Sequence, residues 1–164
     1  MRQLTDVPRR RSTEGVDMSN DHEEIRALVH AYPERLDSGD LEGVADLFAH
    51  ARLVAGDGSV FEGRDTLLGL WRSSVRLYDD GLPHCCHLIS NLTITVEPDG
   101  KSATSSSYVQ VMQAVDDFRL QPVAISQHRD RFSKVEGRWR FVERRDRQLL
   151  AGDMSRHVLG IAAS

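Results

Sequence analysis

Two residues far apart in the sequence could together form an acid–base pair. Asp37 lies near the end of a helix-like segment, YPERLDSGD at 32–40, and His87 opens a strand-like segment, HCCHLISNLTITV at 84–96. An imidazole oriented by a carboxylate is a working general base near neutral pH. Such a base removes a proton next to a carbonyl or a leaving group, a first step that eliminations, isomerisations and aldol closures share. The alternative is that Asp37 caps a turn within DSGD and that His87 is merely hydrogen-bonded in a wall.

The N-terminal half predicts helices that could carry Asp37. Apolar residues recur at steps of three and four from position 21, forming one stripe: Ile25, Leu28, Val29, Tyr32 and Leu36. Pro33 removes an amide donor from this helix and predicts a kink or a break. A second short helix is expected to begin with Asp40 as its cap, and a third to run through 64–78.

The remaining segments predict an antiparallel sheet. Residues 51–63 indicate two short strands about a Gly-Asp-Gly turn. Four longer strand-like stretches follow, separated by turns rich in Gly, Asp and Pro, at 87–97, 102–115, 123–135 and 138–149. This order of elements favours an α+β fold in which helices cover one face of a curved sheet.

The position of His87 on its strand requires an irregularity. The apolar face of that strand consists of Leu88, Leu92, Ile94 and Val96. A regular strand would therefore place His87 on the opposite side, because side chains alternate. We expect a bulge between about 88 and 92 that turns His87 inward.

Arg145 is a candidate for holding a substrate oxygen. Alternate residues of the last strand share one face, which carries Trp139, Phe141, Glu143, Arg145 and Arg147. If the two aromatic residues point into the core, Arg145 points toward a pocket mouth, where it could polarise a carbonyl or hold an oxyanion. The alternative is a structural ion pair between Glu143 and Arg145.

Three further side chains are candidates for the pocket wall: Trp71, Tyr108 and His128. Trp71 lies on the apolar face of the third helix. His128 alternates with residues opposite to Val123 and Ile125, and we expect it at the rim.

Composition limits the class of protein. The chain has 164 residues, 40% of them hydrophobic, which suits one globular domain. A formal charge of −4 with both signs interspersed gives no reason to expect nucleic acid or an anionic membrane as partner. The N-terminal region has no apolar leader, and no apolar run approaches the roughly 20 residues that span a bilayer, so we expect a soluble cytoplasmic protein. Residues 1–20 predict a disordered arm, whose arginines 9–11 are either a solvated tail or a contact for nucleic acid or lipid.

Motifs for metals and cofactors are weak in this sequence. On a strand, the four residues of HCCH at 84–87 point alternately to two faces, so at most two of them converge where zinc needs three or four ligands. The same alternation argues against a disulfide between Cys85 and Cys86. The sequence has no phosphate loop, dinucleotide fingerprint or Gly-x-Ser-x-Gly elbow, and we expect no cofactor and no metal.

Four segments in order resemble the SnoaL-like family of the wider nuclear-transport-factor-2-like superfamily: 25–49, VFEGRDTLLGLW at 60–71, HLISNLTI at 87–94 and DRFSKVEGRWRFVERR at 130–145. The resemblance covers about 21–150 and implies a cone, a strongly bent antiparallel sheet wrapped around three helices and enclosing a pocket. We accordingly expect a domain at 21–152 and a C-terminal tail at 153–164. Such folds carry dehydratases, isomerases, cyclases and proteins without catalysis, so the fold does not decide the function.

The resemblance also implies roles for individual residues. Within the superfamily, Asp37 and His87 fall on the acid and histidine of scytalone dehydratase, hexachlorocyclohexane dehydrochlorinase and bile-acid dehydratase. Tyr32 matches a tyrosine of the bile-acid enzyme, and Cys85 a pocket cysteine of the dehydrochlorinase. Two matches are missing: the second histidine of scytalone dehydratase falls near Val123, and the second acid of the bile-acid enzyme near Gln110.

We therefore expect a cofactor-independent, dehydratase-like lyase or isomerase acting on a small hydrophobic, oxygenated ring compound. His87 would be the base, Asp37 would orient it, and Tyr32 or Arg145 would hold the substrate oxygen. The substrate-binding residues would be Arg145, Cys85, Trp71, Tyr108 and His128. A non-catalytic ligand-binding or dimerisation module and a polyketide cyclase-like enzyme are the alternatives. Proteins with this resemblance often pair, and we expect a homodimer or a higher homo-oligomer.

Overall fold

The computed structural model describes residues 18–160 and contains three helices and six strands. Residues 1–17 of the expected N-terminal arm and 161–164 of the expected tail lie outside the described part. The helices are α1 (Met18–Asp37), α2 (Leu41–Leu47) and α3 (Arg64–Ser74). The strands are β1 (Arg52–Val54), β2 (Val60–Glu62), β3 (Cys85–Val96), β4 (Ser102–Val115), β5 (Phe118–Val135) and β6 (Arg138–Ala151).

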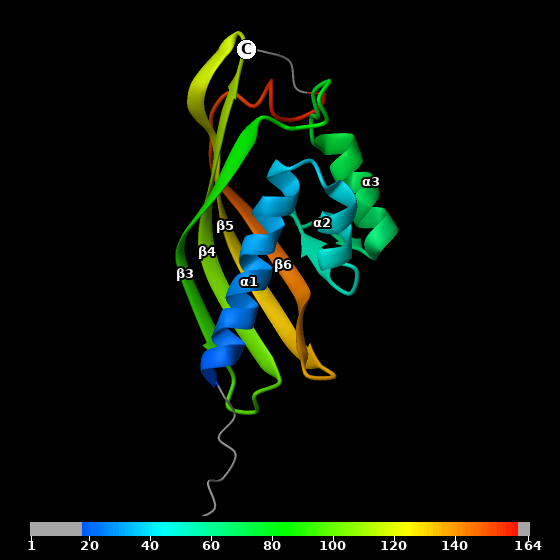
Figure 1. Cartoon of the computed structure of the whole chain (residues 1–164), viewed down its shortest axis with the longest axis vertical. Coiled ribbons are helices and arrows are strands. Elements are labelled where there is room, and N and C mark those ends of the chain that lie inside the picture. Colours follow the sequence, from blue (N-terminus) through cyan, green and yellow to red (C-terminus); the bar gives the residue numbers. More distant parts are fainter. Residues whose placement is uncertain (1–17, 161–164) are drawn as a thin grey trace, which may run out of the picture.

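The strands form one mixed sheet in the order β2-β1-β6-β5-β4-β3. All neighbours are antiparallel except β1 and β6, which are parallel. Figure 1 shows the long strands β3 to β6 curving past α1, with α2 and α3 beside it. The predicted α+β cone is confirmed, and it places the end of α1 against the start of β3.

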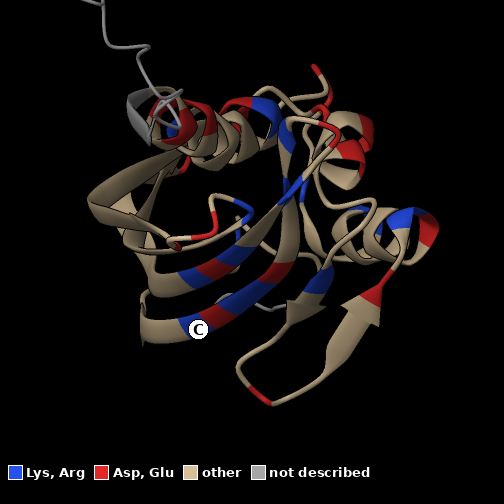
Figure 2. Ribbon diagram, turned by 90° about the horizontal axis from the view of Figure 1, so that it is seen from below, with Lys and Arg blue, Asp and Glu red and all other residues tan. Residues whose placement is uncertain are grey.

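The core lies between the helices and the concave side of the sheet. Ile25 and Val29 of α1 are buried against residues from α2, α3 and the sheet, including Phe48, Trp71 and Phe141. Burying each such side chain contributes about 1.5–3 kcal/mol, so the amphipathic stripe of α1 fixes this helix to the sheet. No helix within 18–160 is long and apolar enough to cross a membrane. Basic and acidic residues are interspersed along the ribbon (Figure 2), as the sequence indicated.

The start of α1 is fixed by a polar contact rather than an apolar one. Asp21 is buried, and its Oδ1 accepts hydrogen bonds from Lys134 Nζ at 2.5 Å and Trp139 Nε1 at 2.9 Å. Burial alone would raise the pKa of Asp21, but these two partners hold it below its ordinary value. The N-terminal end of the helix that carries Asp37 is thus fixed to the sheet.

Three local expectations can be compared with the structure. Asp40 caps α2 as predicted, accepting from the backbone N–H of Gly43 at 2.8 Å. The break expected at Pro33 is wrong, because α1 continues through it to Asp37; Pro33 is buried, and we attribute this to packing of the surrounding turn outweighing the lost hydrogen bond. The turn predicted at 115–122 is shorter in the structure, because β4 ends at Val115 and β5 already starts at the buried Phe118.

Candidate functional site

Asp37 and His87 are in contact in the structure. His87 Nδ1 lies 2.5 Å from Asp37 Oδ1, and the backbone N–H of His87 donates to Asp37 Oδ2 at 2.8 Å. Both carboxylate oxygens are therefore engaged by one residue, which fixes the orientation of the imidazole. The His87 side chain is only 5% exposed. The expected contact is present, and its catalytic role stays a prediction.

A bulge in β3 accompanies the inward position of His87. The register of β3 against β4 shifts between Ser90 and Thr93, and Asn91 adopts a positive φ of 51°. This is the predicted irregularity, located at the predicted residues. Asn is one of the few residue types that adopt such a φ at modest cost. Because of the shift, the part of β3 that carries His87 and the apolar part that follows can both face the core.

Cys85 completes a cluster with the pair. Its Sγ donates to Asp37 Oδ1 at 3.3 Å and lies 3.8 Å from His87 Nδ1. Burial, followed by the negative charge of Asp37, raises the pKa of the Cys85 thiol. Burial acts to raise the pKa of Asp37 as well, but its bonds to His87 and Cys85 outweigh burial and hold it below the ordinary value. Asp37 is thus an anion that three donors stabilise.

The same cluster is also the one group within 18–160 with the donor spacing of a metal site. Donor atoms of Asp37, Cys85 and His87 all lie within 4.8 Å of one another. The third ligand is Asp37 from another element, which the reasoning from HCCH alone did not consider. Two ligands about 2.0 Å from zinc at a tetrahedral angle lie roughly 3.3 Å apart, whereas Asp37 Oδ1 and His87 Nδ1 are only 2.5 Å apart. The arrangement suits a hydrogen-bonded pair better than a metal.

His87 faces a cavity of about 220 Å³ between the helices and the sheet. Its wall combines apolar and polar side chains, among them Tyr32, Leu36, Trp71, Val109, His128, Asp146, Met154 and His157. The Tyr32 ring lies between two imidazoles, with centroids 6.1 Å from His87 and 5.8 Å from His128. Burial raises the pKa of Tyr32 to about 12, which keeps its hydroxyl protonated and able to donate.

The structure places a second imidazole and a second carboxylate in this wall. His128 is buried rather than at the rim, and its Nε2 lies 3.5 Å from Asp146 Oδ1. The resemblance had indicated a lost histidine near Val123, yet this chain brings His128 into the cavity from another position on the same strand. Reasoning from the sequence missed Asp146, because the alternation assumed for β6 assigned it to the outer face.

Arg145 does not reach the cavity, so this expectation is wrong. The register of β5 against β6 shifts between Arg131 and Phe132, and beyond this shift the alternation along β6 changes face. Arg145 is 57% exposed at its side chain and donates to Glu143 Oε1 at 2.8 Å. Glu143 also binds Arg52, so the alternative of a structural ion pair is the one observed. Residues 144, 146 and 148 take the inward positions instead.

Arg144 is the buried arginine of this strand. It is 1% exposed, and its Nε and Nη2 donate to the two oxygens of Asp130, both at 2.8 Å. The guanidinium lies 4.5 Å from the centroid of the Tyr32 ring and 4.9 Å from that of Phe48. Arg144 thus supports the Tyr32 side of the cavity through its ion pair with Asp130, which differs from the substrate-holding role predicted for Arg145.

The expected C-terminal tail closes part of the cavity. Met154, His157 and Val158 are among the lining residues, and the His157 ring lies 6.0 Å from that of His87. Burial, followed by the charge of His87, lowers the pKa of His157 to about 4. His157 is therefore a neutral imidazole near neutral pH, and its buried Nδ1 has no hydrogen-bond partner among residues 18–160.

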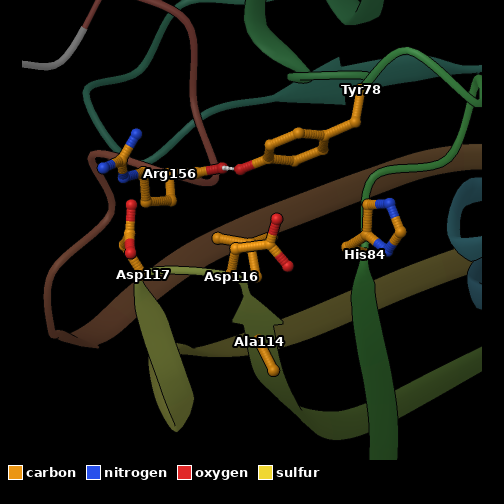
Figure 3. A pocket seen from close by; sticks show the side chains of 7 residues that line it. Tyr78, His84, Ala114, Asp116, Asp117 and Arg156 are labelled. Carbon is orange, nitrogen blue, oxygen red and sulfur yellow. Dashed lines mark hydrogen bonds between the residues drawn. The ribbon is translucent and has the colours of Figure 1, made fainter.

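Residues around a separate hollow hold the segment 153–160 in place. The hollow measures about 450 Å³ and is lined by residues that include Tyr78, His84, Asp117 and Arg156 (Figure 3). The Tyr78 hydroxyl donates to the Arg156 carbonyl at 2.8 Å, and Gln113 Nε2 donates to the same carbonyl at 2.9 Å. These bonds hold residues 153–160 in place. None of the residues predicted for the site lines this hollow.

Tyr108 is also outside the cavity. Its side chain stands on the exposed face of β4, whereas the neighbouring Val109 and Val111 line the cavity. Of the predicted site residues, Tyr32, Trp71, His87 and His128 thus meet at one cavity. Asp37 and Cys85 support His87 from behind.

Comparison with known proteins agrees with this fold. A model of the SnoaL-like domain matches residues 17–145. No curated protein matches the chain. A nuclear-transport-factor-2-like protein with a cystatin-like fold from Novosphingobium aromaticivorans is 24% identical with a TM-score of 0.67, covering 87% of this chain and 97% of its own. A variant of Rv3472, a protein of unknown function from Mycobacterium tuberculosis, is 25% identical with a TM-score of 0.68, covering 85% and 82%.

A third solved structure carries a provisional enzyme assignment. It is a protein from Novosphingobium aromaticivorans provisionally assigned as a scytalone dehydratase, 20% identical with a TM-score of 0.67, and the match covers 90% of this chain and 93% of that one. At this identity the likeness shows the fold alone. The family match spans most of the chain, and this protein belongs to the SnoaL-like family.

Proposed function

We propose that this protein is a cofactor-independent lyase or isomerase in which His87 removes a proton from a small, hydrophobic, oxygenated ring compound. The observation that carries the proposal is the double contact of Asp37 with the ring and backbone nitrogens of His87. A carboxylate can only accept hydrogen bonds, so His87 Nδ1 carries the hydrogen. The lone pair is then on Nε2 of a side chain that lines the cavity.

The chemistry follows from this tautomer. His87 Nε2 takes a proton from a carbon next to a carbonyl, and the Asp37 carboxylate stabilises the imidazolium that forms. Cys85 adds a third donor to Asp37 and helps to keep that carboxylate ionised. The Tyr32 hydroxyl is suited to hold the substrate carbonyl oxygen, on which negative charge develops, because the phenol stays protonated.

The cavity limits the size of the substrate. About 220 Å³ lies below the roughly 300–1,000 Å³ of sites for drug-sized ligands. We expect a compound of one or two rings. The cyclase alternative needs room for a longer polyketide, and this volume does not favour it.

The test uses 3-hydroxy-1-tetralone, a two-ring β-hydroxy ketone whose dehydration gives fluorescent 1-naphthol. Exchange of the ring α-protons of 1-tetralone with D₂O, followed by NMR, reports proton removal alone. We expect Asp37→Asn and His87→Asn each to lower the exchange rate by about 10²–10⁴. Asp79→Asn, an exposed acid away from the cavity, is the matched control and should leave the rate unchanged.

Two results would contradict the proposal. One is wild-type protein that accelerates neither reaction although 1-naphthol binds in the cavity, which would favour the ligand-binding module. The other is a His87→Asn variant, folded by circular dichroism, that exchanges α-protons at the wild-type rate.

A further inference from the structure

The cavity contains a second carboxyl group and imidazole, Asp146 and His128. The pKa of Asp146 is raised, whereas that of Asp37 in the first pair is lowered. Asp146 and His128 approach at 3.5 Å between Oδ1 and Nε2, beyond the usual 2.7–3.2 Å of a hydrogen bond. Asp146 Oδ1 is buried and has no hydrogen-bond partner among residues 18–160, and the same holds for His128 Nδ1. Both residues line the cavity that His87 faces.

The surroundings of this second pair disfavour charge on both groups, although the Asp146 side chain is 41% exposed. Burial raises the pKa of Asp146, with a further contribution from Asp130, although Ser126 and Arg144 act in the opposite direction. Burial, followed by the positive charge of Arg144 and that of His87, holds the pKa of His128 well below its ordinary value. His128 is thus a neutral acceptor, and Asp146 binds a proton more readily than Asp37, whose pKa is lowered.

The Tyr32 ring packs against the imidazole of each pair. Both contacts are edge-on, at 6.1 Å from His87 and 5.8 Å from His128. A substrate in the cavity therefore has a base on one side and a carboxylic acid on another. When their environments shift the pKa values of two such groups in opposite directions, one group is suited to act as an acid and the other as a base.

We propose that Asp146 is the general acid of this site and that the reaction is the elimination of water from a β-hydroxy carbonyl compound. This inference rests on the proposed role of His87 and specifies the reaction. Without an acid, hydroxide would have to leave, so a proton donor at the leaving oxygen distinguishes dehydration from simple isomerisation.

The step balances without any other reactant. His87 Nε2 takes the α-proton, and the electrons of the C–H bond form the new C=C bond. The C–O bond breaks with its electrons on oxygen, which takes the Asp146 proton and leaves as water. His87 is left protonated and Asp146 ionised, and transfer of a proton from His87 to Asp146 through water restores the site.

The experiment separates acid from base by changing the leaving group. Wild type, Asp146→Asn, His87→Asn and the Asp79→Asn control are compared in three reactions. These are α-proton exchange of 1-tetralone, elimination from 3-hydroxy-1-tetralone, and elimination from 3-acetoxy-1-tetralone. Acetate leaves without a proton, so its loss does not need the acid. We expect Asp146→Asn to slow elimination of water by about 10²–10⁴ while changing the other two rates less than about tenfold.

The outcomes distinguish the two proposals. Loss of all three reactions in His87→Asn together with selective loss in Asp146→Asn supports both. Equal loss of all three reactions in Asp146→Asn, or no loss of water elimination, overturns the role of Asp146 and leaves that of His87 intact. If Asp146→Asn does not fold, Asp146→Ser removes the acid without added volume and replaces it. A wild-type rate of exchange in His87→Asn overturns the function itself.

Discussion

Replacing Asp130 by asparagine should destabilise this protein more than any change of an exposed charge on the same sheet. Asp130 and Arg144 are 2% and 1% exposed, and they share two hydrogen bonds of 2.8 Å. The amide of the new side chain could keep one of these bonds, but Arg144 would remain as a buried, uncompensated charge. Arg144 Nη1 already has no hydrogen-bond partner within 18–160, so the guanidinium has no second acceptor to use.

The magnitude follows from this arrangement. Removing one partner of a buried ion pair costs about 3–5 kcal/mol. The aromatic rings of Tyr32, Phe48 and Phe141 still face the guanidinium and offset part of the loss, so we expect the lower half of that range. At roughly 2–4 °C per kcal/mol for a chain of this length, the melting temperature should fall by about 6–16 °C.

Urea unfolding followed by circular dichroism measures this change, with two further variants for comparison. Arg147→Met removes an exposed arginine of the same strand and should cost less than about 0.5 kcal/mol. The double variant Asp130→Asn with Arg144→Met should be more stable than Asp130→Asn alone, because no unpaired charge is then buried. A loss below about 1 kcal/mol in Asp130→Asn would show that water reaches Arg144, and the reasoning would be refuted.

Three other predictions concern the His87 side of the cavity. The pKa of Asp37 is held below its ordinary 3.8, so the stability it contributes is complete above pH 3.8 and is lost as the pH falls through the folded-state value; acid unfolding of Asp37→Asn should therefore lack this component. Because its pKa is raised and it is partly buried, the Cys85 thiol should react with a disulfide reagent much more slowly than the exposed Cys86 thiol. The Cys86→Ser variant reports the rate of Cys85 and the Cys85→Ser variant that of Cys86, and equal rates would contradict the contact of Cys85 with Asp37. Asn91→Ala should cost about 1 kcal/mol or more in urea unfolding and Asn91→Gly almost nothing, since only alanine is strained at a φ of 51°; equal stabilities would argue against the bulge.

The sequence predicted what local patterns determine. The stripe on α1, the Asp40 cap and the order of strands depend on neighbouring residues, and the structure has them. The contact of Asp37 with His87 and the bulge near Asn91 were predicted because an apolar face and a resemblance constrained the same strand from two directions.

The far side of the cavity could not be predicted in the same way. The register of β5 against β6 shifts between Arg131 and Phe132, so that Arg144 rather than Arg145 points inward. Simple alternation along the strand does not predict such a shift. Asp146 was therefore assigned outward. His128 was placed at the rim for another reason: Val123 and Ile125 were taken to mark the inward face, but Ala124, Ser126 and His128 line the cavity. The position of His157 in the cavity wall was not predicted, because the residues around it show no strand or helix periodicity. Its placement depends on Gln113 and Tyr78, which are distant in sequence.

The segment 153–160 bears on what membership of the family says about the cavity. The family match ends at residue 145, whereas Asp146, Met154 and His157 lie beyond it and form part of the cavity wall. The Asp37–His87 pair thus lies inside the matched segment, whereas part of the cavity wall lies beyond it. The shape of the cavity around His87 therefore depends on residues on both sides of the limit of the match. Membership of the family accordingly does not specify the part of the wall that Asp146, Met154 and His157 form.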